Sequence, residues 1–241
     1  MKKLLLAGGA GLVGQHLLHI LDKSRYEITV IDKDKSLIKK LKKQFINIKF
    51  ISADLSNYKD LFGIQFKFDI LVILQAQIKG LNYDEFYNNS VVSTKNLIKL
   101  IKLNSINPYV VHISSSVINS KADDFYTRSK REQEQIIRDW IGKKIILRPT
   151  LMYGEGDNKH FFVLLKLMSR FHFFPLPGNG NYIRQPLYAA DFAYVISDCL
   201  DNTKTGIFNI SGLELLTFKD CLLKFKKNYK ILAFMVPFPN S

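Results

Sequence analysis

Three polar residue types in the middle of the chain have the spacing of an acid/base site. Ser114-Ser115-Ser116 ends an apolar run, and Tyr126 lies ten positions after Ser116 and four before Lys130. Residues four apart on a helix share a face, so the lysine ammonium can approach the phenol and favour its ionised form. A free phenol has a pKa of about 10, and a nearby positive charge brings it toward the range of a working base. The pattern favours proton transfer over a solvated surface pair.

A glycine-rich turn near the N-terminus indicates phosphate binding. The first apolar run leads into Gly8, Gly11 and Gly14 at the opening of a helical segment. Gly8 permits a tight turn, Gly11 lets backbone N–H groups approach a pyrophosphate, and Gly14 allows the helix to pack closely on the strand. Leu12 and Val13 occupy the helix N-terminus, where the dipole favours phosphate charge.

The next apolar run ends in Asp32, at the distance where an acidic residue receives the adenosine ribose hydroxyls of a dinucleotide. An aspartate at this place repels a 2′-phosphate, which favours NAD. Lys33 and Lys35 follow closely and offer a phosphate some compensation. NAD is therefore the expected cofactor, and NADP stays open.

Elements that can position these residues alternate along residues 1–150. Apolar runs of strand length are separated by segments of helical periodicity, which predicts an α/β fold with a doubly wound parallel sheet, the Rossmann fold, and a ligand at the carboxyl ends of the strands. The expected strands are 3–6, 27–31, 48–52, 70–74, 109–114 and 144–147, and the expected helices are 12–21, 36–43, 83–103 and 125–140.

After Pro149 the rhythm changes, because glycines and prolines punctuate a more irregular region. We therefore expect residues 1–150 to form the NAD-binding domain and residues 151–241 to form a small substrate-binding lobe, shortened in extent. A late strand near 207–210 is expected to return to the main sheet.

The order of glycine turn, acidic strand end, serine cluster and Tyr-x-x-x-Lys resembles the extended short-chain dehydrogenase/reductases, in particular the NAD-dependent epimerase/dehydratase family of nucleotide-sugar enzymes. The resemblance covers nearly the whole chain. Further segments that carry it are Ala53-Asp54-Leu55, Asp69 to Gln77, Leu147-Arg148-Pro149 with Tyr153-Gly154, Gly178 through Arg184 to Asp191, and 206–210.

The resemblance implies a role for each polar residue of the site. Tyr126 would be the acid/base, Lys130 its electrostatic support and a ligand of the cofactor ribose, and Ser116 the hydroxyl partner, with Ser115 as the fallback. Arg184 would bind a substrate phosphate, since a guanidinium pairs with phosphate oxygens in bidentate fashion.

The resemblance also implies further cofactor contacts. Asp54 would meet the adenine with Leu55 beside it, and Leu74 and Ala76 would line the cofactor channel. The segment Leu74-Gln75-Ala76-Gln77 departs from the family, which usually has His-Leu-Ala-Ala here, so a bulkier amide faces the cofactor channel.

The reaction is expected to be redox at one sugar carbon. No Thr-Asp-Glu follows the strand at 109–114, which speaks against a 4,6-dehydratase. A 4-epimerase and a 4-keto reductase acting on a nucleoside-diphosphate sugar fit the same residues equally well, and the resemblance implies a place in polysaccharide biosynthesis. The alternative is a protein that binds NAD without turnover and serves as a scaffold or regulatory subunit.

The family resemblance further implies a possible homodimer through helices 83–103 and 125–140.

Composition narrows the partners and the compartment. The chain has 241 residues, 47% of them hydrophobic, and its only cysteines, Cys199 and Cys221, have no metal-binding or redox spacing. We therefore expect no metal site and a reducing, cytoplasmic setting. No apolar run approaches the length of a membrane span. The net charge is +14, but the lysines are scattered without an aromatic platform, so nucleic acid is not an expected partner.

Overall fold

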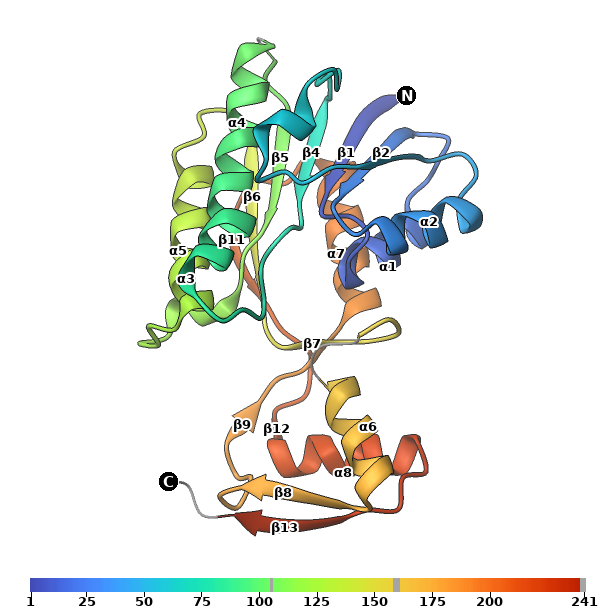
Figure 1. Ribbon diagram of the computed structural model, residues 1–241, viewed down its shortest axis with the longest axis vertical. Coiled ribbons are helices and arrows are strands. Elements are labelled where there is room, and N and C mark those ends of the chain that lie inside the picture. Colours follow the sequence, from blue (N-terminus) through green and yellow to red (C-terminus); the bar gives the residue numbers. More distant parts are fainter. Residues whose placement is uncertain (105, 158–160, 239–241) are drawn as a thin grey trace. The chain divides into compact units, whose positions relative to one another are not determined.

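A computed structural model gives the arrangement of residues 1–104, 106–157 and 161–238, drawn in Figure 1. The chain divides into two compact units. The first comprises Met1–Pro149 and Ala190–Ile210, and the second comprises Thr150–Ala189 and Ser211–Ser241. The stretch Ala190–Ile210, placed in the smaller lobe by the sequence apart from its late strand, therefore belongs to the first unit.

The first unit is built on a seven-stranded parallel sheet in the order β11-β6-β5-β4-β1-β2-β3. The strand order reverses between β1 and β4, so the carboxyl ends of these two strands mark the topological switch point where ligands bind in such sheets. The strands are β1 Lys2–Ala7, β2 Tyr26–Asp32, β3 Lys49–Ser52, β4 Ile70–Ile73, β5 Tyr109–Ile113, β6 Lys144–Pro149 and β11 Gly206–Ile210.

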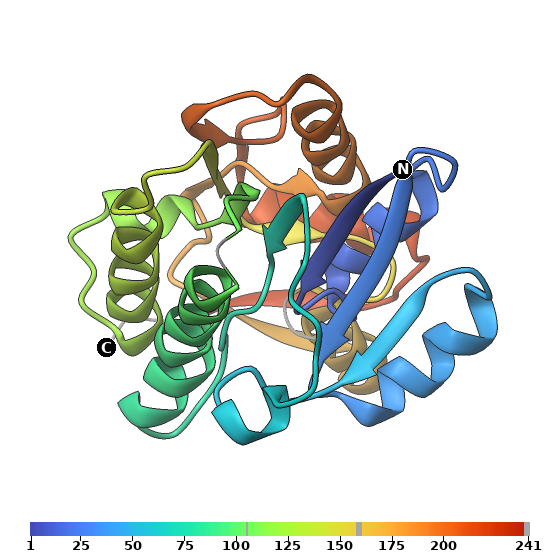
Figure 2. The ribbon, with the colours of Figure 1, turned by 90° about the horizontal axis from the view of Figure 1, so that it is seen from above.

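Helices cover both faces of this sheet, with α4 and α5 on one side and α1, α2 and α7 on the other (Figures 1 and 2). The doubly wound α/β fold predicted from the sequence is thereby confirmed. The helices of the unit are α1 Leu12–Ile20, α2 Lys35–Gln44, α3 Tyr83–Phe86, α4 Ser93–Leu103, α5 Phe125–Arg138 and α7 Ala189–Asn202, and the short 3-10 turns are η1 Tyr58–Leu61 and η3 Ser116–Asn119.

The central strands are apolar on both faces because helices cover both faces. All four residues of β4 and all five of β5 are buried. Strands covered on both faces lose the alternation of buried and exposed residues and read as continuous apolar runs. At about 25 cal/mol per Å² of buried apolar surface, this core supplies the main favourable free energy of folding.

The segment predicted as one helix over 83–103 is divided by a π-helical stretch, η2, at Tyr87–Val92. The hydroxyl of Thr94 donates to the Ser90 carbonyl oxygen at 2.8 Å, and that of Ser93 donates to the Asn89 carbonyl oxygen at 2.8 Å. Such hydroxyls compete for the carbonyls of the preceding turn. Single π-helical turns inside helices are frequent at functional sites.

A buried carboxylate fastens α5 to β6. Glu134 on α5 accepts hydrogen bonds from the guanidinium of Arg148 on β6 at 2.6 and 3.1 Å, and from Arg138 at 2.9 Å. Burial alone would raise the pKa of Glu134, but hydrogen bonds with Arg148, Ser114 and Arg138 together outweigh burial and lower it. Paired in this way, the charge holds the C-terminal half of α5 against β6.

The second unit has its own core, formed around Met168, Phe174, Leu176 and Leu222. None of the helices in residues 1–104, 106–157 and 161–238 is both long and apolar enough to cross a membrane. The elements of the second unit are β7 Met152–Tyr153, α6 Phe161–Phe171, β8 Phe173–Pro177, β9 Ile183–Arg184, β10 Leu187–Tyr188, β12 Leu216–Thr217, α8 Phe218–Asn228 and β13 Phe234–Phe238.

Candidate active site

The glycine turn lies at the switch point of the sheet, against the end of β4. Gly8 has a φ of +75°, which side chains rarely adopt. A Cβ on Gly8 would lie 2.5 Å from the backbone nitrogen of Gln75, and a Cβ on Gly14 would lie 2.2 Å from the carbonyl oxygen of Gly9. Neither position admits a side chain, so both glycines are required by the close approach of β1, β4 and α1.

Gly11 differs from its two neighbours because nothing in the protein crowds it. Its φ is −71°, and the nearest atom to an added Cβ is the Gly8 carbonyl oxygen at 3.5 Å. As the N-cap of α1 it brings no side chain to the helix end. The N–H groups of Leu12 and Val13 open the first turn, where helical N–H groups lack partners within the helix. An open glycine beside free N–H groups fits a pyrophosphate.

Asp32 lies beside this turn, as the sequence predicts. Its carboxylate accepts a hydrogen bond from the N–H of Ala10 at 3.1 Å and another from the N–H of Asp34 at 3.0 Å. Burial raises the pKa of Asp32 above the usual range of an aspartate, against the effect of these hydrogen bonds. The ammonium of Lys33 is engaged elsewhere, with Asn89 Oδ1 at 2.6 Å. The one lysine directly after Asp32 therefore already has a partner.

A cavity of about 470 Å³ opens beside Asp32, at the ends of β2 and β3. The Asp54 carboxylate at its edge accepts hydrogen bonds from the N–H and the hydroxyl of Ser56, at 2.8 and 2.7 Å. Leu55 points elsewhere, since its side chain belongs to the hydrophobic core. The residues that line the cavity are Lys33, Asp34, Lys35, Ser52, Ala53, Asp54 and Asp60.

Leu74 and Ala76 directly follow β4 and are half-buried. The N–H groups of Leu74 and Gln75 donate to the Ala7 carbonyl oxygen at 2.8 and 3.1 Å. The end of β4 is thus fixed to the end of β1, and the predicted channel residues stand at the switch point beside the glycine turn.

Tyr126 lies in the first turn of α5, which the Asp124 carboxylate caps by accepting the Thr127 N–H at 3.0 Å. Burial raises the pKa of the Tyr126 phenol above its usual value, while a hydrogen bond with the Ser115 hydroxyl acts to lower it. The phenol is therefore protonated at neutral pH in the protein alone. Ser115, the predicted fallback, is the serine that contacts Tyr126, whereas Ser116 begins the turn η3.

Lys130 is fully buried one turn further along α5, with only 1% of its surface exposed. Its Nζ donates to the Ile113 carbonyl oxygen at 2.8 Å and to Gln133 Oε1 at 2.6 Å. Burial lowers the pKa of Lys130 to about 7, although the negative charge of Glu134 acts in the opposite direction. An amine at this pKa is close to half-charged at neutral pH, so small changes around it alter its charge.

The sequence prediction of the site does not include two residues near Lys130, Gln133 and Thr94. Gln133 and Thr94 are both fully buried, and Gln133 Nε2 donates to Thr94 Oγ1 at 2.9 Å. The signal in the sequence is a glutamine three residues after the lysine, on the buried face of an otherwise charged helix. Polar residues on such a helix are normally read as solvent-exposed.

Arg184, the predicted phosphate ligand, belongs to the second unit, where it lies on β9. Its side chain is exposed and its guanidinium stacks over the Tyr182 ring, 4.5 Å from the ring centre. Arg184 Nη1 also donates to the Ile183 carbonyl oxygen at 3.1 Å, so the other N–H groups of the guanidinium are the ones available for an anion.

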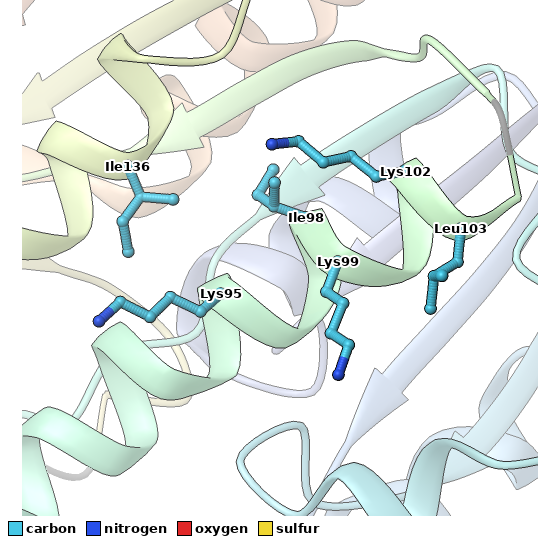
Figure 3. A pocket seen from close by; sticks show the side chains of 6 residues that line it. All are labelled: Lys95, Ile98, Lys99, Lys102, Leu103 and Ile136. Atoms are coloured by element: carbon cyan, nitrogen blue, oxygen red, sulfur yellow. The ribbon is translucent and has the colours of Figure 1, made fainter.

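A second cavity, of about 380 Å³, lies between α4 and α5 (Figure 3). None of the predicted catalytic residues lines it. Lys95 is engaged with the Tyr87 hydroxyl at 3.0 Å, and Lys99 stacks over the Tyr58 ring at 4.5 Å. The lining residues are Lys95, Ile98, Lys99, Lys102, Leu103 and Ile136.

Within residues 1–104, 106–157 and 161–238 the structure has no cluster of three or more residues able to ligate a metal ion. The two cysteines are both free and buried.

Comparison with known proteins matches most of the chain to one family. The model of the NAD dependent epimerase/dehydratase family matches residues 4–211. A curated 4-epimerase of N-acetyl-alpha-D-glucosaminyl-diphospho-ditrans,octacis-undecaprenol from Escherichia coli O157:H7 is 23% identical, over 98% of this chain and 75% of that protein. A dTDP-4-dehydrorhamnose reductase from Aggregatibacter actinomycetemcomitans is 24% identical, over 91% of this chain and 76% of that protein.

Solved structures share the fold over the full length of the chain. UDP-glucuronic acid 4-epimerase from Bacillus cereus, solved in complex with NAD, superposes with a TM-score of 0.81 at 22% identity, over 99% of this chain and 86% of that one. A Bordetella bronchiseptica enzyme in complex with NAD+ superposes with a TM-score of 0.85 at 15% identity, over 100% of this chain and 85% of that one.

Burial of Lys130 predicts a specific pH dependence of stability. The unfolded chain keeps the lysine proton up to a pH of about 10.4, whereas the native protein releases it near its pKa of about 7. The unfolded state therefore binds more protons in this window, and the free energy of unfolding rises with pH. Relative to Lys130→Met, wild type should gain about 4 kcal/mol between pH 7 and pH 10, measured by urea denaturation.

The matched control for this measurement is Lys121→Met, which removes an exposed lysine. Its curve should stay parallel to that of wild type over the whole pH range. Parallel curves for wild type and Lys130→Met would contradict the burial of a titrating amine at this position.

Proposed function

The chain belongs to the NAD-dependent epimerase/dehydratase family, and from this premise we propose that it transfers a hydride to and from a nucleoside-diphosphate sugar with Tyr126 as the acid/base. The observation that carries the proposal is that one helix, α5, presents Tyr126 next to the Ser115 hydroxyl and buries Lys130 one turn away.

NAD is the cofactor of this family, and the residues around the glycine turn fit it. The N–H groups that open α1 would hold the pyrophosphate over Gly11, and Asp32 would receive the adenosine ribose hydroxyls. Lys33 is paired with Asn89, which leaves the negative charge of Asp32 to disfavour a 2′-phosphate. When bound, NAD supplies the nicotinamide carbon that accepts the hydride and returns it.

Tyr126 moves the hydroxyl proton of the sugar. Its raised pKa makes it a proton donor in the resting protein, and removal of a substrate proton requires the phenolate. A positive charge on Lys130 favours the phenolate. The serine hydroxyls at the end of β5 orient the substrate oxygen, with Ser115 already in contact with the phenol and Ser116 next to it.

A 4-epimerase and a 4-keto reductase remain the two forms of this activity. Both need one hydride, one proton and the same serine, tyrosine and lysine, and the curated relatives include proteins of both kinds. In both forms the diphosphate of the substrate would be bound by Arg184.

We also propose that two copies pair through α4 and α5, where Leu103, 66% exposed, lines the cavity of Figure 3. Light scattering should then give twice the 27.8 kDa of one chain for wild type. Leu103→Asp should give the mass of one chain, because it places a charge in the apolar interface. A single-chain mass for wild type would contradict the pairing.

Replacement of the acid/base tests the function directly. Tyr126→Phe keeps the ring and removes the hydroxyl, so turnover of the accepted nucleotide sugar should fall by about three orders of magnitude or more while NADH binding changes little. Turnover is followed by sugar product analysis and NADH binding by fluorescence. Tyr194→Phe, an exposed tyrosine on α7, is the matched control and should keep full activity.

Two results would contradict the assignment. Full activity in Tyr126→Phe would remove the tyrosine from the mechanism. NADH binding by wild type, with no turnover of any UDP- or dTDP-sugar, would instead support a cofactor-binding scaffold or regulatory subunit.

A further inference from the structure

Gln133 is a buried amide on α5 whose oxygen and nitrogen both make hydrogen bonds. None of its surface is exposed. Its Oε1 accepts a hydrogen bond from Lys130 Nζ at 2.6 Å, and its Nε2 donates to the Gln75 carbonyl oxygen at 3.1 Å and to Thr94 Oγ1 at 2.9 Å. An apolar side chain would be the usual choice at a buried helix position, because burying a polar group costs free energy unless it is hydrogen-bonded. A glutamine with three satisfied hydrogen bonds at this position therefore indicates a specific role.

Donor and acceptor chemistry allows only one orientation of this amide. A backbone carbonyl can only accept, so the side that faces Gln75 must be the NH₂ group. The Thr94 hydroxyl spends its single proton on the Ser90 carbonyl oxygen at 2.8 Å, so it too can only accept from Gln133. Both constraints turn Oε1 toward Lys130, where it accepts a hydrogen bond from the amino group.

The two acceptors around Lys130 fix the direction of its amino group. An ammonium has three N–H groups, and two of them point to Ile113 O and Gln133 Oε1. The direction of the third N–H group is then set by the tetrahedral geometry of the ammonium. Ile113 O is backbone and belongs to β5, so Gln133 is the side chain on which this orientation depends.

Gln133 also connects Lys130 to the phosphate-binding turn. Gln133 Nε2 donates to the carbonyl oxygen of Gln75. The N–H of Gln75 donates in turn to the Ala7 carbonyl oxygen at 3.1 Å, and the backbone of Gln75 leaves no room for a Cβ on Gly8. A continuous series of hydrogen bonds and close contacts thus runs from the lysine of α5 to the turn after β1.

We propose that Gln133 is a positioning residue that keeps the Lys130 amino group charged and directed toward the cofactor ribose, and that it does so from an anchor on the strand that abuts the glycine turn. The proposal rests on the function given above for Lys130. It assigns the glutamine a part in the hydride-transfer site through the lysine and no contact with substrate.

Other groups that face Lys130 do not take over this task. His112 on β5 is buried, and burial together with the positive charge of Lys130 lowers its pKa well below the usual value, so it is neutral. Glu134 on α5 acts on Lys130 through its charge but is paired with two arginines. Tyr126, on the same helix, holds its proton.

Two substitutions separate the acceptor from the anchor. Gln133→Met has similar length and removes all three hydrogen bonds, whereas Gln133→Glu keeps an acceptor for Lys130 and loses the donors to Gln75 and Thr94. Gln135→Met is the matched control, since Gln135 is exposed on the same helix and bonds only to Asp139 at 2.8 Å in the described structure.

The first readout is the free energy of unfolding against pH, which needs neither substrate nor cofactor. In Gln133→Met the pH at which stability begins to rise should move down by about one pH unit relative to wild type, the effect of losing one hydrogen bond to a charged donor. In Gln133→Glu it should move up, because a carboxylate favours the ammonium. Gln135→Met should follow wild type.

The second readout is the pH profile of kcat. The pH at which kcat falls on the alkaline side should be lower than in wild type for Gln133→Met and higher for Gln133→Glu. An unchanged onset in the unfolding curves of both variants would overturn the proposal, even if both were less stable. If the onset shifts in both variants and neither the variants nor wild type turns over any UDP- or dTDP-sugar, the positioning of Lys130 is supported and the proposed function is wrong.

Discussion

The burial of one amino group dictates the arrangement around the site. Removing an ammonium from water costs several kcal/mol unless hydrogen bonds replace the lost solvent. Around Lys130 those bonds come from β5 and from Gln133, and the glutamine is held in turn by α4 and the end of β4. Four elements of the first unit therefore meet at this lysine, and the glycine turn packs against the same end of β4.

Much of this could be predicted from the sequence because the signals are local or periodic. The apolar runs of β1, β4 and β5 are continuous because the strands are buried on both faces, and continuous runs are easy to find. Gly8 and Gly14 were identified from spacing, and the structure shows the contacts that forbid a side chain there. The family and its NAD cofactor were identified in the same way, from motifs in the right order.

The rest depended on contacts that no local pattern encodes. The division of the helix at 83–103 comes from hydroxyls such as that of Thr94 bonding back to the preceding turn, and its partner Gln133 lies 39 positions away in the chain. The choice between Ser115 and Ser116 depends on how the chain turns after β5, which residue types alone leave open. The helix α7 joins the first unit through long-range contacts such as that of Tyr26 with Asp201 at 2.8 Å.

Titration with NADH, followed by nicotinamide fluorescence, tests the central claim most directly, and the open position of Gly11 provides its control. Wild type should bind NADH, with a signal that changes when one UDP- or dTDP-sugar is added. Gly11→Ala should keep the unfolding free energy within about 1 kcal/mol, because the added methyl meets only the Gly8 carbonyl oxygen, at the ordinary contact distance of 3.5 Å. It should bind NADH about tenfold or more weakly, because the methyl would occupy space that the pyrophosphate needs. Absence of NADH binding by wild type, or equal binding by Gly11→Ala, would contradict a pyrophosphate site at this turn.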